Sequence, residues 1–185
     1  MPPKVKTDQN MIVTAAFNIA KNEGFAAITA QKVAAMLGTS VAPIFRVFQT
    51  VEQLRVATAE KINCFHVEYI KNHSAKDLTF LSYGIAYIQF AKQFPYLFET
   101  IMHPIYTKQY HLNEQISKQL GFIVDSIINE SSLSTEQAKE LFYHIWIYTH
   151  GIACFVYQGN INFTEQTEKQ LLIDAFKAFL KNYKT

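Results

Sequence analysis

The chain has 185 residues, of which 49% are apolar and 17% are charged, a composition that excludes an intrinsically disordered protein. It contains only 6 Gly and 5 Pro, too few for a β sandwich with many turns, and this scarcity favours long helices. The net charge is +2, but residues 1–50 carry five basic and two acidic groups, a distribution that weakly favours a polyanionic partner.

Neither the cysteines nor the apolar segments indicate secretion or membrane insertion. Cys64 and Cys154 lie far apart in apolar helical runs, so we expect reduced thiols in a cytosolic protein. The N-terminus has no apolar stretch of the signal-peptide type. The most apolar segment, 145–157, is shorter than the roughly 20 residues of a membrane helix. We therefore expect a cytoplasmic protein with no membrane partner.

Apolar residues recur at helical spacing along almost the whole chain, and no strand-like alternation competes with this pattern. The first helix should end at Gly24 and the second at Gly38, because glycine suits the residue after a helix. Hydroxyl side chains predict helix N-caps at Thr29, Ser40, Thr50 and Thr164. The expected helices are about 8–22, 30–37, 41–46, 51–72, 78–94, 95–102, 108–130, 135–158 and 165–183.

Two composition regimes predict an all-α protein of about nine helices in two domains. Residues 1–50 form short helices with tight glycine turns, as in a three-helix, helix-turn-helix DNA-binding domain. This domain should extend into the connector helix to about residue 62. Residues 51–185 form longer, aromatic-rich helices, which predict a C-terminal domain for ligand binding, regulation and dimerisation.

The two short helices around Gly38 have the spacing of a helix-turn-helix. Small side chains at the start of its second helix would let that helix approach base edges in the major groove. Hydroxyl groups and free backbone N–H groups at helix starts suit phosphate oxygens. An ordinary helical hairpin without a ligand is the alternative. The candidate DNA-binding residues are Thr29, Ala30, Gln31, Lys32, Thr39, Ser40, Val41, Ala42, Pro43, Phe45, Arg46, Gln49 and Thr50.

This region resembles the N-terminal domain of the TetR/AcrR family over about residues 8–62. The resemblance is carried by Gly24-Phe25, Thr29-Ala30-Gln31-Lys32-Val33-Ala34, Leu37-Gly38-Thr39-Ser40, Pro43-Ile44-Phe45-Arg46-Val47-Phe48 and Glu52-Gln53-Leu54. Stretches 87–98 and 146–153 resemble the ligand-sensing domains of some members more loosely.

The resemblance implies a homodimer that acts as an allosteric repressor, with the helix from Thr39 to Arg46 in the DNA groove. Two positions depart from the family pattern. Phe45 stands where members usually have Tyr, and Val51 stands where they usually have Lys. Each departure removes one expected contact with the DNA backbone.

The helix expected at 135–158 is apolar on nearly every side, so it must be buried on more than one face. The last helix carries a clear apolar stripe. We predict that these two helices pair with their copies in a four-helix interface. The alternative is that they cover the core of a single chain. The predicted interface residues are Ile145, Ile152, Phe155, Val156, Leu172, Phe176 and Phe179.

Aromatic side chains with polar tips in this C-terminal part predict a pocket for an apolar or aromatic small-molecule effector. A plain aromatic core is the alternative. The candidate pocket residues are Tyr83, Tyr87, Phe90, Phe98, Met102, Tyr106, Trp146 and Tyr148.

Glu140 and His144 have the spacing of a helical metal site, which His103, His111 and His150 could complete, but isolated helical histidines are more often core or surface residues. We therefore predict no metal and no cofactor. No catalytic motif has convincing spacing, so we predict no enzyme. The predicted function is a ligand-responsive regulator, most simply a repressor released from a palindromic operator. The alternative is a small-molecule-binding or protein-interaction module without specific DNA binding.

Overall fold

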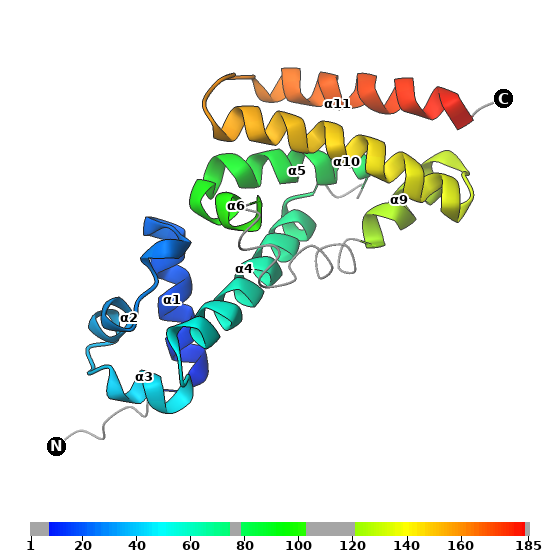
Figure 1. Ribbon diagram of the computed structural model, residues 1–185. Helices are drawn as coiled ribbons and strands as arrows, with labels where there is room; N and C mark the ends of the chain where they lie inside the picture. The colour runs from blue at the N-terminus through cyan, green and yellow to red at the C-terminus, as the bar shows by residue number, and fades with distance from the viewer. Residues whose placement is uncertain (1–7, 75–78, 103–120, 184–185) are drawn as a thin grey trace. The chain divides into compact units, whose positions relative to one another are not determined.

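The computed structural model describes residues 8–74, 79–102 and 121–183, and these residues form helices without any strand (Figure 1). The all-α prediction is confirmed. The α-helices are α1 (Gln9–Glu23), α2 (Ala30–Met36), α3 (Ala42–Val47), α4 (Val51–His73), α5 (Phe80–Gln93), α6 (Pro95–Met102), α9 (Gly121–Ser131), α10 (Thr135–Tyr157) and α11 (Glu165–Leu180). Two short 3₁₀ helices are η1 (Phe25–Ala27) and η2 (Lys181–Tyr183).

Side-chain caps begin three of these helices at residues that the sequence predicted. The hydroxyl oxygens of Thr29, Thr50 and Thr164 each accept a hydrogen bond from the backbone N–H three residues later. Ser134 and Gln137 form a reciprocal capping box at the start of α10. The beginning of the helix expected at 108–130 lies outside the described residues.

The predicted cap at Ser40 is wrong. Helix α3 begins at Ala42, and Val41 is the N-cap without a side-chain hydrogen bond. A cap at Ser40 would bond the N–H group of residue 42 or 43, and Pro43 has no N–H to offer. Ser40 therefore lies in the turn that precedes α3 and is exposed.

The chain divides into two compact units, and it passes from the first to the second within α4, after Phe65. The first unit contains α1 to α3, the start of α4 and the part of α6 from Tyr96 onwards. The second unit contains the end of α4, α5 and α9 to α11. No helix in the described part of the chain is long and apolar enough to cross a membrane.

In the first unit, α1 packs against η1 and α2, and α2 packs against α3. Helix α1 buries a continuous apolar face that includes Ile12, Ala16 and Ile19. The edge of the Phe17 ring meets the Phe65 ring of α4, with centroids 5.3 Å apart. These contacts hold α2 and α3 in place within the first unit.

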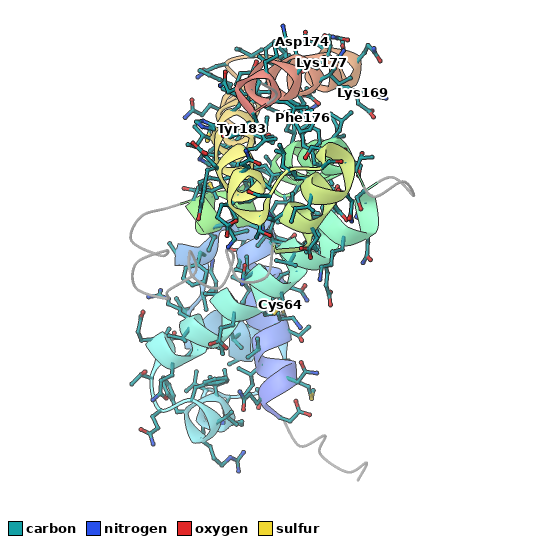
Figure 2. The ribbon with its side chains drawn as sticks, turned by 90° about the vertical axis from the view of Figure 1, so that its right-hand side faces the viewer. Cys64, Lys169, Asp174, Phe176, Lys177 and Tyr183 are labelled. Atoms are coloured by element: carbon teal, nitrogen blue, oxygen red, sulfur yellow. The ribbon has the colours of Figure 1, made fainter. Side chains whose placement is uncertain are left out.

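In the second unit, α10 packs against α5, α9 and α11 (Figure 1). Its core is a cluster of apolar side chains contributed by all four helices: Phe80, Ile127, Ala138, Leu141, Ile145 and Ala175. Figure 2 shows α11 with Asp174 and Lys177 on its outer side and Phe176 directed towards the helices beneath it. Phe176 stacks on Phe80 of α5 with ring centroids 3.9 Å apart.

Candidate nucleic-acid interface and ligand cavity

Helices α2 and α3 form a helix-turn-helix whose turn is fixed by backbone hydrogen bonds. The Thr39 N–H donates to the Ala34 carbonyl at 3.0 Å, and the Gly38 N–H donates to the Ala35 carbonyl at 3.2 Å. This pair of bonds is a Schellman motif, which requires a left-handed residue, and Gly38 has a φ of 62°. The glycine therefore sets the direction in which the chain enters α3.

The predicted DNA-binding residues are on or near the surface of this motif, with one exception. Eight of them are exposed: Gln31, Lys32, Ser40, Ala42, Phe45, Arg46, Gln49 and Thr50. Four are half-buried: Thr29, Thr39, Val41 and Pro43. Ala30 is only 1% exposed, because it lies on the inner face of α2 with Val33 and Ala34. The Ala30 side chain therefore cannot contact DNA, and its choice as a contact residue is corrected.

Several of these polar groups already have partners within the first unit. The Thr29 and Thr50 hydroxyl oxygens cap α2 and α4, each at 3.2 Å from the N–H group that they accept. The Lys32 ammonium lies 2.5 Å from the Glu23 carboxylate, and both side chains are about half exposed. Arg46, which is exposed on α3, forms no ion pair with any described residue. Arg46 is therefore the cation of α3 that is available to a phosphate or a guanine.

Two residues of this region were missed by the sequence analysis. Met36 is 48% exposed at the end of α2, beside the turn. The guanidinium of Arg55, on α4, donates to the Ile28 carbonyl at 3.1 Å and so fixes the segment that leads into α2. The sequence signal for Arg55 was weak, because a supporting arginine and a DNA-contacting arginine look alike in one sequence.

The second unit contains a small cavity of about 40 Å³ among α4, α5, α9 and α10. Three of the predicted pocket residues line it, namely Tyr83, Tyr87 and Trp146. The other walls among the described residues, which the sequence analysis did not assign to a pocket, are Ile70, Phe80, Gly84, Ile123, Ile127, Phe142, Ile145 and Thr149. These are ordinary core residue types, so nothing in the sequence distinguished them from the rest of the core.

The remaining predicted pocket residues lie elsewhere. Phe90 is fully buried and packs against the rings of Tyr69 and Phe94. Phe98 and Met102 belong to α6 and to the first unit. Tyr148 is 37% exposed on the surface of α10. Tyr106 lies outside the described residues.

A polar pair stands beside the cavity. The Tyr87 hydroxyl lies 3.1 Å from Nδ1 of His150, and the His150 ring stacks against Trp146 with centroids 5.8 Å apart. The Sγ atom of Cys154 lies 3.4 Å from Nε2 of the same histidine. Burial raises the pKa of Tyr87 far above its usual value and lowers the pKa of His150. The pair is therefore uncharged at neutral pH.

His66 adds a third uncharged group close to this pair. Its ring is 1% exposed, and its edge meets the rings of Phe90 and Tyr87, with centroids 4.7 and 5.5 Å away. Neither ring nitrogen has a hydrogen-bond partner among the described residues. Burial lowers the pKa of His66 to about 3, so the imidazole is neutral throughout the physiological range.

The predicted dimer residues differ in exposure: three are buried, Phe155 is exposed, and Val156, Phe176 and Phe179 are half-buried. Ile145 and Ile152 are 6% exposed and Leu172 is 0% exposed, so their side chains serve the core of their own unit. Their choice as interface residues is corrected on this ground. Phe179 stacks on the ring of His144, and Phe155 is 50% exposed.

Helix α10 also has an apolar face that is exposed to solvent, apart from the face that carries Ile145 and Ile152. Tyr143, Ile147 and Phe155 are between 50% and 63% exposed, and they follow one another at helical spacing together with Gly151. A groove of about 410 Å³ runs beside them towards α11. It is lined by Ile147, Tyr148, Gly151, Ile152, Phe155, Ile161, Phe163 and Leu171.

The possible metal pair has other contacts. His144 stacks on Phe179 with centroids 5.2 Å apart, and the carboxylate of Glu140 acts on Tyr183, whose pKa burial and this carboxylate raise. No three metal-ligating side chains gather within the described residues. His103 and His111 lie outside that part of the chain.

The sequence matches no protein-family model and no curated protein. Solved structures match it over almost its whole length. A protein of unknown function from Rhodococcus sp. RHA1 is 15% identical, with a TM-score of 0.72 over 98% of each chain. A TetR-family transcriptional regulator from Streptomyces coelicolor is 12% identical, with a TM-score of 0.68 over 95% of this chain and 82% of that one.

A TetR-family regulator from Vibrio parahaemolyticus is 14% identical, with a TM-score of 0.65 over 91% of this chain and 96% of that one. The chain has the fold of TetR-family transcriptional regulators. The resemblance inferred from the helix-turn-helix residues is thus confirmed for the fold along the chain.

Proposed function

We propose that the protein is a ligand-responsive, DNA-binding transcriptional regulator. In this proposal it is a cytoplasmic homodimer that represses transcription from a palindromic operator and leaves it when a small molecule binds. The observation that supports this most directly is the exposed helix-turn-helix at the start of a chain with the TetR fold.

Helix α3 would enter the major groove with its small N-terminal residues leading. Val41 and Ala42 have small side chains, the first half-buried and the second exposed. They would therefore not hold the backbone of α3 away from the base edges. Arg46 would supply the charged contact of α3, to guanine or to a phosphate. The further contacts for base recognition would be Gln31 and Thr39, and those for positioning would be Lys32, Ser40 and Thr50.

Lys32 can turn from Glu23 to a phosphate at little cost. Both side chains are about half exposed, and an exposed ion pair of this kind stabilises a protein by less than about 1 kcal/mol. Thr50 can donate its hydroxyl hydrogen to a phosphate while its oxygen still accepts the Gln53 N–H. The internal partners of these residues are therefore compatible with DNA contact.

The exposed apolar face of α10 supports the homodimer. Three large apolar side chains, Tyr143, Ile147 and Phe155, are at least half exposed on one helix. A contiguous apolar surface of this kind is typical of a protein interface. In the dimer, the two copies of α3 would read half-sites about 34–36 Å apart, one turn of DNA.

The effector would act by binding one conformation of the dimer better than the other. The ligand would bind in the second unit and favour a dimer in which the separation of the two α3 helices does not match the DNA. It would thereby shift the population away from the DNA-bound form. Helix α4 is the element through which the chain joins the two units, so it is the natural route for this coupling.

The first test is DNA binding by the intact protein and by the variants Arg46→Ala and Lys177→Ala. We expect the purified protein to select a palindromic site from DNA around its own gene and to keep it at raised salt. Arg46→Ala should weaken binding about 10-fold or more, the typical value of one charged base or phosphate contact. Lys177→Ala removes the same charge from α11, which belongs to the second unit and not to the helix-turn-helix, so it should change binding little. Mobility shift or fluorescence anisotropy at two salt concentrations measures both.

A protein-interaction module without specific DNA binding is the second candidate. The observation that favours it is the scarcity of cations on the helix-turn-helix, where Lys32 is paired and Phe45 and Val51 replace polar residues expected from the family resemblance. Weak binding to every DNA tested, lost at raised salt and equal in Arg46→Ala, would support this candidate and contradict DNA-specific regulation.

A further inference from the structure

The exposed face of α3 consists of three residues of different chemistry. Phe45 is 43% exposed, and Ala42 and Arg46 are exposed as well. Because each residue of an α-helix turns the chain by about 100°, Phe45 and Arg46 lie about 60° and about 40° to either side of Ala42. Ile44 is buried on the opposite side of the helix. The surface that α3 presents to solvent is therefore a small alanine between an aromatic ring and a cation.

The position of Phe45 gives its exposure a meaning. A single exposed apolar side chain needs no explanation on an ordinary protein surface. Phe45, however, stands on the helix that the proposed function places in the DNA groove, beside the exposed Arg46. Val41 lies one turn before it and is half-buried, so it extends the apolar side of this face. The ring has no hydrogen-bonding group and cannot bond to a phosphate as a tyrosine would.

The major groove offers one apolar group that such a ring can contact. The base edges carry hydrogen-bond donors and acceptors, and only thymine adds a methyl group, at C5. Packing Phe45 on this methyl group removes apolar surface of both partners from water, which is favourable. Against guanine or cytosine the same ring would cover polar groups without bonding to them, which is unfavourable.

We propose that Phe45 is a specificity-determining residue whose ring packs on the 5-methyl group of a thymine in each half-site of the operator. Ala42 leaves the room that the ring needs beside the base edges, and Arg46 contacts a guanine or a phosphate on the other side of Ala42. This inference rests on the proposed function, DNA binding through α3, and names the base that the apolar side of this helix selects.

The experiment replaces thymine by uracil, which lacks the 5-methyl group and keeps every hydrogen-bonding group of the base. The full-length protein selects its site from a random library of double-stranded DNA. The selected duplex is then synthesised with 2′-deoxyuridine at each thymine in turn, and binding is followed by fluorescence anisotropy. At one thymine of each half-site we expect uracil to weaken binding about 4-fold. This factor corresponds to about 0.8 kcal/mol, the free energy of burying one methyl group.

Variants then assign the effect to Phe45. Phe45→Ala should bind the thymine and uracil duplexes equally, whereas Phe45→Tyr keeps the ring and should keep the preference. Arg46→Ala is the control for lost affinity, because it should weaken binding to both duplexes and leave their ratio unchanged. Val56→Ala, which shortens an exposed apolar side chain on α4 outside the helix-turn-helix, should change neither. The comparison of the two duplexes uses the unmodified protein, so it does not depend on the folding of a variant.

The outcomes separate this inference from the proposed function. Equal binding of uracil and thymine at every position, a selected half-site without thymine, or an unchanged preference in Phe45→Ala would each overturn the role of Phe45. Specific DNA binding with any of these results would contradict this inference alone. If no specific site is selected, the proposed function fails, and the role of Phe45 fails with it.

Discussion

Single residues of the second unit show what burial does to titratable groups. His66, Tyr87 and His150 are held in uncharged forms, because the surrounding apolar side chains disfavour their ions. Tyr87 and His150 also contact each other, with the hydroxyl oxygen 3.1 Å from Nδ1. The buried His66 imidazole has no hydrogen-bond partner among the described residues, and such burial is costly, so we expect this position to contribute less to stability than an apolar residue of similar size would.

His66 predicts a specific dependence of stability on pH. In the folded protein its pKa is about 3, whereas the ordinary value is 6.5. Between these values the unfolded chain binds one more proton than the folded chain, so the free energy of unfolding falls as the pH falls. The part of the free energy of unfolding that depends on the titration of His66 is complete above pH 6.5. It decreases by about 1.4 kcal/mol per unit below that and is lost near pH 3.

The variants His66→Leu and His66→Phe should therefore flatten the pH profile of stability between pH 6.5 and 4.5. They should also be at least as stable as the natural protein at pH 7, since they remove a buried polar group that has no hydrogen-bond partner in the described part of the chain. Urea unfolding at several pH values measures both effects. Two replacements of different shape separate titration from packing, and a profile as steep as that of the natural protein in both would contradict the assignment to His66.

Helices α5, α10 and α11 pack closely because particular residues of one helix fit against residues of another. A Cβ atom on Gly84 of α5 would lie only 2.9 Å from Leu172 Cδ1 of α11, so a larger residue would require the Leu172 side chain to shift. The Lys92 ammonium of α5 lies 2.6 Å from the carboxylate of Glu168 on α11, whose side chain is 0% exposed. This ion pair holds the first turns of α11 against the end of α5.

Removing Lys92 should leave the Glu168 carboxylate buried without its counter-charge. We expect Lys92→Met to lower the free energy of unfolding by about 2 kcal/mol, below the usual cost for a fully buried pair because Lys92 is 29% exposed. The double variant Lys92→Met with Glu168→Met should recover most of this loss, since no charge is then buried.

Chemical unfolding of the single and double variants forms a double-mutant cycle. Lys177→Met, on the outer side of α11, is the matched control and should have little effect (Figure 2). A loss in Lys92→Met no larger than in this control would show that the ion pair does not stabilise the packing of α11.

At the scale of the whole molecule, the proposed function involves a dimer, and the exposed face of α10 is the surface proposed for it. We expect a species of about 42 kDa at micromolar concentration, twice the 21.2 kDa of one chain. Ile147→Glu and Phe155→Glu should each produce a monomer, because a charge on this face would be buried without a partner in the dimer.

Sedimentation velocity measures the mass of each variant. Val56→Glu on α4 is the control, since it places the same charge on an apolar side chain exposed in the other unit. A natural protein that sediments at 21 kDa would contradict the dimer. Variants that remain dimeric would instead exclude this face of α10 as the interface.

Local chemistry explains how much of the molecule could be predicted. Helical periodicity, the caps at Thr29, Thr50 and Thr164 and the turn glycine Gly38 act over a few residues, so the sequence contains their full signal. The same locality made the helix-turn-helix recognisable. The cap predicted at Ser40 failed for an equally local reason, the missing N–H of Pro43.

The sequence by itself therefore determined the helical class, the order of the helices and the motif that carries the proposed function. Only the tertiary structure decided which apolar residues face inward. It buried Leu172 and Ile152 and left Ile147 and Phe155 exposed, although all four are apolar. It also brought Tyr87 to His150 from two helices far apart in the chain. Burial and cross-helix contacts depend on which surfaces approach one another, and residues distant in sequence set that approach.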